Sequence, residues 1–116
     1  MASKQVTKWA LICNMCLDML LVVSRGQRQK QVGKVFGSST AVGHAFFAHA
    51  LIRGIAGFNV ESITLRRAAF YSLLIELYYV LTSGKSFKTM RPILLVLGAM
   101  LTIVGSTLKK NFAPKI

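Results

Sequence analysis

Ionisable side chains interrupt the apolar stretches of this chain, and four of them are candidates for chemistry. Asp18 lies in WALICNMCLDMLLVVS, His49 and Arg53 lie in AVGHAFFAHALIRGIAGF, and Glu76 lies in AAFYSLLIELYYVL. Carboxylate, imidazole and guanidinium groups can relay protons, bind a charged substrate or hold helices together. Because a charged group in hydrocarbon is costly unless it is paired, these side chains are expected to lie close together.

The elements that must position these residues are four apolar segments with polar, basic loops between them. The segments cover residues 9–24, 35–58, 68–83 and 92–108, and 53% of the chain is hydrophobic. Their lengths straddle the roughly 20 residues that cross a bilayer. A soluble four-helix bundle would need a polar stripe on each helix, and PILLVLGAMLTIVGSTL has none. No removable presequence is expected, because Asp18 interrupts the first segment.

The pattern therefore predicts an all-α integral membrane protein. We expect a single domain over residues 1–116, with four transmembrane helices in an up-down bundle and both termini on the same side. Lys and Arg divide equally between the two sides, so the positive-inside rule does not give an orientation.

Helix geometry brings the ionisable residues to one level. At 1.5 Å rise per residue, Asp18, His49 and Glu76 all lie about 12–14 Å from the terminal side, and Arg53 lies about 6 Å nearer that surface. We therefore predict a buried ionic cluster of Asp18, His49, Arg53 and Glu76. Its structural interpretation is attachment of one helix to another, which we prefer. The functional alternative is a proton relay or a substrate site.

Two further sets of residues suit a membrane-embedded helical protein. Small residues allow close approach of helices, its own or those of a partner. Cations beside the spans suit lipid headgroups, including anionic phospholipid such as cardiolipin. The helix-packing candidates are Ser39, Gly43, Ala50, Gly54, Gly57, Gly98 and Gly105. The headgroup candidates are Arg25, Arg28, Lys30, Lys34, Arg66, Arg67, Lys109 and Lys110.

The charge balance requires anionic partners. The chain has 15 Lys and Arg against three acids, for a formal charge of +12. A soluble nucleic-acid-binding domain would gather its cations on one face, whereas here they fall between apolar segments, so no nucleic-acid partner is expected.

No catalytic motif is visible. The chain lacks HExxH, GxSxG and a phosphate-binding loop, and its two cysteines, in CNMC, cannot form a four-ligand zinc site alone. We expect no catalytic residue, metal or cofactor, and predict that the protein is not an enzyme.

The phrase VGHAFFAHALIR, residues 42–53, resembles the ergosterol biosynthetic protein 28 family. That family has a phrase of the type FGxWTLLSxxIR, to which Gly43, Ile52 and Arg53 correspond, and a tryptophan opening its first span, here Trp9. An Asn and a Thr-Leu pair follow in both, here Asn59 and Thr64 with Leu65. The resemblance implies a four-span scaffold that holds sterol C-4 demethylation enzymes together in the endoplasmic reticulum.

The sequence thus predicts a non-catalytic accessory or scaffold subunit of a membrane complex. Its size, basicity and few acids are typical of supernumerary subunits of the mitochondrial inner membrane, in the respiratory chain or ATP synthase. The alternatives are a sterol-biosynthesis scaffold of the endoplasmic reticulum membrane, as the resemblance implies, and a small proton-coupled transporter with Asp18 as its carboxylate.

Overall fold

The computed structural model describes residues 4–37 and 39–108, apart from the side chains at positions 25, 28, 31 and 32. It is all-α, as predicted, and the described part contains no strand. Its helices are α1 (Lys4–Val23), α2 (Arg25–Phe36), α3 (Thr40–Phe58), α4 (Ile63–Leu81) and α5 (Phe87–Ser106).

A serine starts each helix after the first. The hydroxyls of Ser24, Ser39, Ser62 and Ser86 accept hydrogen bonds from the backbone N–H three residues ahead, at 3.2–3.3 Å. Each hydroxyl thereby satisfies one of the N–H groups that have no partner in the first turn of a helix. These caps fix where α2, α3, α4 and α5 begin.

The observed helix boundaries differ from those expected from the apolar segments. The basic stretch 25–34, expected as a loop, belongs to α2, and α3 begins at Thr40 instead of residue 35. The first, third and fourth predicted segments extend toward the N-terminus, to Lys4, Ile63 and Phe87. The predicted segments followed apolar character, whereas a helix continues through polar residues until a cap or turn ends it.

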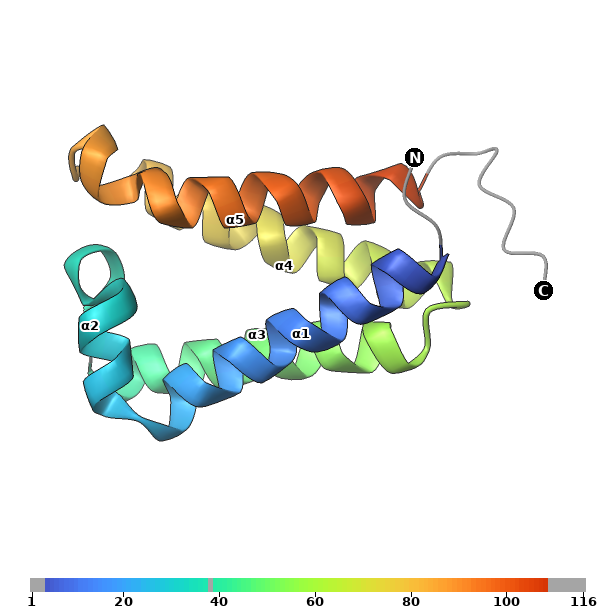
Figure 1. Cartoon of the computed structure of the whole chain (residues 1–116), viewed down its shortest axis with the longest axis horizontal. Coiled ribbons are helices and arrows are strands. Elements are labelled where there is room, and N and C mark those ends of the chain that lie inside the picture. Colours follow the sequence, from blue (N-terminus) through green and yellow to red (C-terminus); the bar gives the residue numbers. More distant parts are fainter. Residues whose placement is uncertain (1–3, 38, 109–116) are drawn as a thin grey trace.

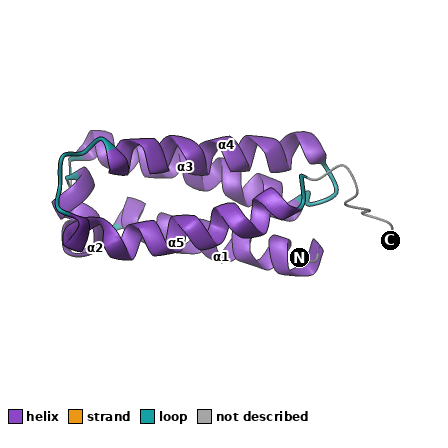
Figure 2. Ribbon diagram, turned by 90° about the horizontal axis from the view of Figure 1, so that it is seen from above, coloured by secondary structure: helices purple, strands orange, loops and turns teal. Residues whose placement is uncertain are grey.

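The four long helices run side by side with alternating direction (Figures 1 and 2). Figure 1 shows α1 and α3 in one layer and α4 and α5 in the other, with the short α2 across one end. The start of α1, the α3–α4 connection and the end of α5 share the opposite end.

Glycines bring α3 close to α1. A Cβ on Gly57 would lie 2.9 Å from Ile12 Cγ1 and 3.2 Å from the backbone oxygen of Lys8, and one on Gly54 would lie 2.2 Å from Met15 Sδ. Real Cβ atoms essentially never approach other atoms within 3.0 Å, so a side chain at either position would force a neighbour on α1 to shift. The tight α1–α3 pair holds Asp18 and Arg53 within reach of each other.

The apolar core links the layers. It includes Leu11 from α1, Ala56 from α3, Leu73 from α4 and Val104 from α5, all fully buried. Phe36 at the end of α2 stacks on Tyr79, with ring centroids 5.1 Å apart, and packs edge-on against Phe46. These aromatic contacts attach α2 to the end of the bundle.

Three of the described helices, α1, α3 and α5, are long and apolar enough to cross a membrane by length and composition. The fourth long helix, α4, carries Arg66, Arg67 and Glu76 and does not meet that standard. Of the four predicted transmembrane helices, three are therefore candidate spans by this standard.

Candidate functional site

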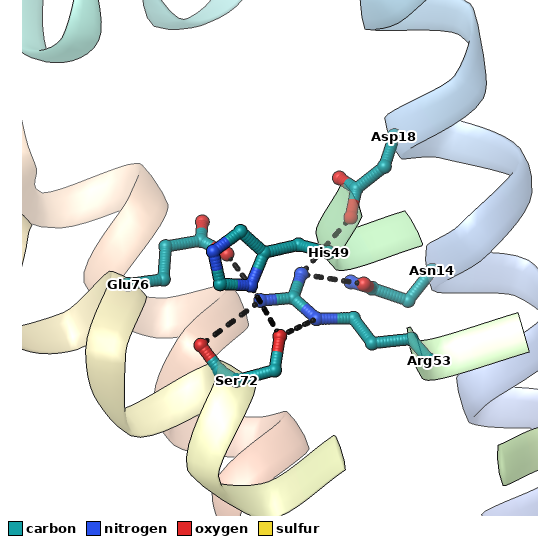
Figure 3. Close-up of polar contacts among 6 residues, drawn as sticks. All are labelled: Asn14, Asp18, His49, Arg53, Ser72 and Glu76. Carbon is teal, nitrogen blue, oxygen red and sulfur yellow. Dashed lines mark hydrogen bonds and ion pairs between the residues drawn. The ribbon is translucent and has the colours of Figure 1, made fainter. Parts of the chain in front are cut away.

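Three helices each contribute two polar side chains spaced by one helical turn. They are Asn14 and Asp18 from α1, His49 and Arg53 from α3, and Ser72 and Glu76 from α4. Residues four apart lie on the same face of a helix, so each pair presents its polar atoms to the space between the helices. We call these six residues the Arg53 cluster (Figure 3).

Arg53 is at the centre of the cluster and uses all of its donors. Nη1 donates to Asn14 Oδ1 and Asp18 Oδ2, both at 2.9 Å. Nη2 donates to Glu76 Oε1 at 2.5 Å and to the Ser72 carbonyl at 3.5 Å, and Nε donates to Ser72 Oγ at 3.2 Å. A guanidinium has five N–H groups, so these acceptors saturate it.

The guanidinium is almost completely buried. The Arg53 side chain is 1% exposed, and its partners Asp18 and Glu76 are 9% and 14% exposed. A buried charge is tolerated where ion pairs and hydrogen bonds replace its hydration, and here they do so from two neighbouring helices. The cluster therefore connects α1, α3 and α4 through one side chain.

His49 lies at the margin of this arrangement. Its Nδ1 forms a short hydrogen bond with Ser72 Oγ and contacts neither carboxylate through a hydrogen bond or ion pair within the described residues. It was predicted as a full member of the ionic cluster, whereas it joins through the serine hydroxyl.

The cluster has one negative charge in excess when both carboxyl groups are ionised. Asp18 and Glu76 then face a single guanidinium. Asp18 Oδ1 and Glu76 Oε2 accept no hydrogen bond from the described residues. In Figure 3 these two oxygens point away from the guanidinium.

Two cavities adjoin the cluster, and Glu76 lines both. One, of about 360 Å³, lies mainly between α1 and α5 and is lined by Asp18 and Arg53 as well. The other, of about 270 Å³, lies between α3 and α4, and His49 is among its lining residues. Glu76 thus borders a cavity on each side.

The predicted helix-packing residues divide into two groups. Gly43, Ala50, Gly54 and Gly57 are buried, and Gly105 is close to Phe70, whose ring would lie 3.1 Å from an added Cβ. Ser39 does not pack between helices, because it is exposed and caps α3. Gly98 is also exposed, with nothing within 4 Å of an added Cβ, so no described helix of this chain packs against it.

Arg66 corrects the predicted headgroup set. Its side chain is buried, and it donates to the Val60 and Thr107 carbonyls, which joins the start of α4 to the end of α5. Lys30, Lys34 and Arg67 are exposed, as headgroup contacts require. The side chains of Arg25 and Arg28, and all of Lys109 and Lys110, lie outside the described residues.

Sequence reasoning missed Asn14 and Ser72. Both are buried and both accept hydrogen bonds from Arg53. The signal was present in the spacing, because each lies four residues before a predicted carboxylate and so shares its helix face.

No protein-family model matches the chain, and comparison with curated proteins and with solved structures found none that is similar. The interpretation of the Arg53 cluster therefore depends on its own geometry.

Proposed function

We propose that this protein is a non-catalytic accessory subunit of a multi-subunit membrane complex, with the Arg53 cluster fastening its helices together. The observation that supports this most directly is the saturation of Arg53. All five N–H groups are occupied by acceptors from α1 and α4, so the guanidinium has no donor left to polarise a substrate.

The surface supports a partner-bound state. Large apolar side chains are exposed on α1, α4 and α5, including Trp9, Leu17, Tyr78 and Leu95. Exposed apolar surface of this extent suits lipid and neighbouring spans. In this proposal α4 is the fourth span, and pairing with Arg53 offsets the cost of placing Glu76 in hydrocarbon.

The proposed location is the mitochondrial inner membrane, in a respiratory-chain or ATP synthase complex. A formal charge of +12 with three acids favours a setting rich in anionic phospholipid such as cardiolipin and in acidic subunits. The exposed Lys30, Lys34 and Arg67 are the headgroup contacts of this proposal.

The test is native extraction of the tagged protein in mild detergent, followed by identification of the membrane and of co-migrating proteins. Co-migration with respiratory-chain or ATP synthase subunits is the expected result. Migration of the chain alone, in digitonin as well as in dodecyl maltoside, would contradict the accessory role.

A sterol-biosynthesis scaffold of the endoplasmic reticulum is the second candidate. It is favoured by the place of Arg53, the last residue of the phrase that resembles the ergosterol biosynthetic protein 28 family, at the centre of the cluster. In that case sterol C-4 demethylation enzymes co-migrate, and loss of the protein raises C-4 methylated sterols.

A small proton-coupled transporter is the third candidate, favoured by the cavity that reaches Asp18 and Glu76. Asp18→Asn should then abolish transport. A variant that assembles normally and transports at the wild-type rate would remove this candidate.

A further inference from the structure

The Arg53 cluster lacks one positive charge. Its two carboxylates share a single guanidinium, and His49 bonds to Ser72 and lines the other cavity. Among the described side chains that line the 360 Å³ cavity, Arg53 is the only cation. An uncompensated negative charge in a low-dielectric interior attracts a cation or a proton.

The hydrogen-bonding capacity of the cluster determines whether a ligand should be positively or negatively charged. Arg53 has no remaining N–H group, so it cannot receive a carboxylate or phosphate. By contrast, Asp18 Oδ1 and Glu76 Oε2 are both without a donor from the described residues. An ammonium group supplies the donors and the charge that these two oxygens lack.

The rest of the cavity is largely apolar. Apart from the cluster residues and Gln27, its walls are apolar side chains of α1, α3 and α5, among them Leu17, Leu20, Leu21, Val96 and Leu97. A volume of about 360 Å³ accommodates a small organic molecule but is too generous for a bare ion. The cavity thus combines a hydrocarbon wall with two carboxylate residues, Asp18 and Glu76.

The cavity also has an entrance from the outer face. Leu17, Leu20 and Val96 line it and are 61%, 48% and 53% exposed on the surface of the protein. They lie in the apolar parts of α1 and α5, which are candidate membrane spans. A ligand dissolved in the hydrocarbon of a bilayer would reach the carboxylates by this route.

We propose that the cavity between α1 and α5 binds a lipophilic amine in its protonated form. The ammonium group pairs with Asp18 and Glu76, and the alkyl part lies along Leu17, Leu20 and Val96. This site uses the same cluster as the proposed accessory role but needs no partner subunit. Ligand binding by the purified chain and co-migration in native extracts therefore fail or succeed separately.

The test measures octylammonium binding to the purified full chain in dodecyl maltoside, from the rise of the thermal unfolding midpoint with ligand concentration. Octanol and octanoate, which have the same alkyl chain without the positive charge, are the matched ligands. A saturable rise with octylammonium and none with octanol or octanoate is the expected result. Equal effects of octylammonium and octanol would overturn the proposal, as would no effect of either.

Variants locate the site. Asp18→Asn keeps an acceptor for Arg53 but removes the excess charge, so it should weaken octylammonium binding by about tenfold or more. Val96→Phe narrows the cavity without changing a charged residue, so it should weaken octylammonium binding in a folded protein. This variant tests the site even if Asp18→Asn does not fold. Glu61→Gln removes the remaining acid of the chain, which is exposed and paired with Lys4, and should leave binding unchanged. Wild-type affinity in Val96→Phe, or a loss in Glu61→Gln equal to that in Asp18→Asn, would overturn the assignment.

Discussion

At the residue scale, Arg53 explains why polar groups are tolerated between these helices. A lysine at this position would offer three donors from one point, whereas the planar guanidinium reaches acceptors on α1 and α4 together. Removing the guanidinium leaves two carboxylates facing each other in a buried site. The intact ion pairs of Arg53 thus add little net stability, whereas breaking them by removing one partner lowers the stability of the protein strongly.

Arg53→Leu should therefore lower the free energy of unfolding by about 3–5 kcal/mol, as for other broken buried ion pairs. Adding Glu76→Leu should restore part of this loss, because it removes one of the two unpaired carboxylates. The measurement is a double-mutant cycle from denaturant unfolding in detergent. An additive double variant would show that Arg53 and Glu76 are not energetically coupled. Arg67→Leu, at an exposed arginine, is the matched control and should change stability by less than about 0.5 kcal/mol.

The neighbouring arginines of α4 should separate two roles that the sequence does not distinguish. Arg66→Gln removes hydrogen bonds to the Val60 and Thr107 carbonyls, so it should destabilise the protein by about 1–3 kcal/mol and leave its affinity for cardiolipin unchanged. Arg67→Gln should do the reverse, with a loss of about 1 kcal/mol in lipid binding. Unfolding curves and a cardiolipin titration in nanodiscs measure the two effects. Equal loss of cardiolipin affinity in both variants would return Arg66 to the headgroup set.

The sequence predicted the meeting of Asp18, Arg53 and Glu76 because few charged residues occur in apolar segments and their depths agree. It could not predict that Arg66 is buried and bonded within the protein, because the Thr107 carbonyl to which Arg66 donates is 41 residues away along the chain. Nor did the sequence show that His49 bonds to Ser72, since the depth of a side chain in the bundle does not identify its hydrogen-bond partner.

At the element scale, two glycines of α3 lie at the contact with α1. Gly57 faces the Lys8 backbone and the branched side chain of Ile12, neither of which can move aside easily. Gly54 faces the end of Met15, a flexible side chain that can adjust. The two glycines therefore differ in what a substitution would disturb.

Gly57→Ala should destabilise the protein by about 1–3 kcal/mol through overpacking, and Gly54→Ala should cost less. Gly98→Ala is the matched control, because its Cβ would meet nothing within 4 Å. An alanine is favoured over glycine in a helix by up to about 1 kcal/mol, so Gly98→Ala should not destabilise the isolated chain. Denaturant unfolding of the three variants tests this order. A destabilised Gly98→Ala in the monomer would mean that α5 packs differently from the structure.

Hydrophobicity alone could not predict α2. Its sequence RGQRQKQVGKVF is polar over most of its length, and Val35 and Phe36 at its end join the apolar core. The local signals were Ser24 before it and Gly37 after it, which has a positive φ of 80°. Such capping residues specify a helix independently of burial, and the same pattern at Ser39, Ser62 and Ser86 would have corrected the other boundaries.

At the scale of the whole molecule, the question is how the bundle sits in a bilayer. Its longest dimension is 42 Å, similar to the thickness of a bilayer with its headgroups, and α4 runs alongside the candidate spans (Figure 2). The charges that weaken α4 as an isolated span are Arg66, Arg67 and Glu76. Arg66 is bonded within the protein, Arg67 is near the end of the bundle and Glu76 is paired with Arg53. The packed bundle therefore offsets the cost of placing these three charged residues of α4 in a membrane.

If α4 crosses the membrane, its two flanking loops face opposite sides. Single cysteines at Glu61→Cys and Lys85→Cys, both exposed positions, report on these loops once Cys13 and Cys16 are replaced by serine. In sealed vesicles of uniform orientation, a membrane-impermeant maleimide should label only one of the two before detergent is added. Lys34→Cys, at the α2 end of the bundle, should share the accessibility of Lys85→Cys (Figure 1). Labelling of Glu61→Cys and Lys85→Cys from the same side would place α4 along the membrane surface. Glu76 and the rest of the Arg53 cluster would then be surrounded by water instead of hydrocarbon.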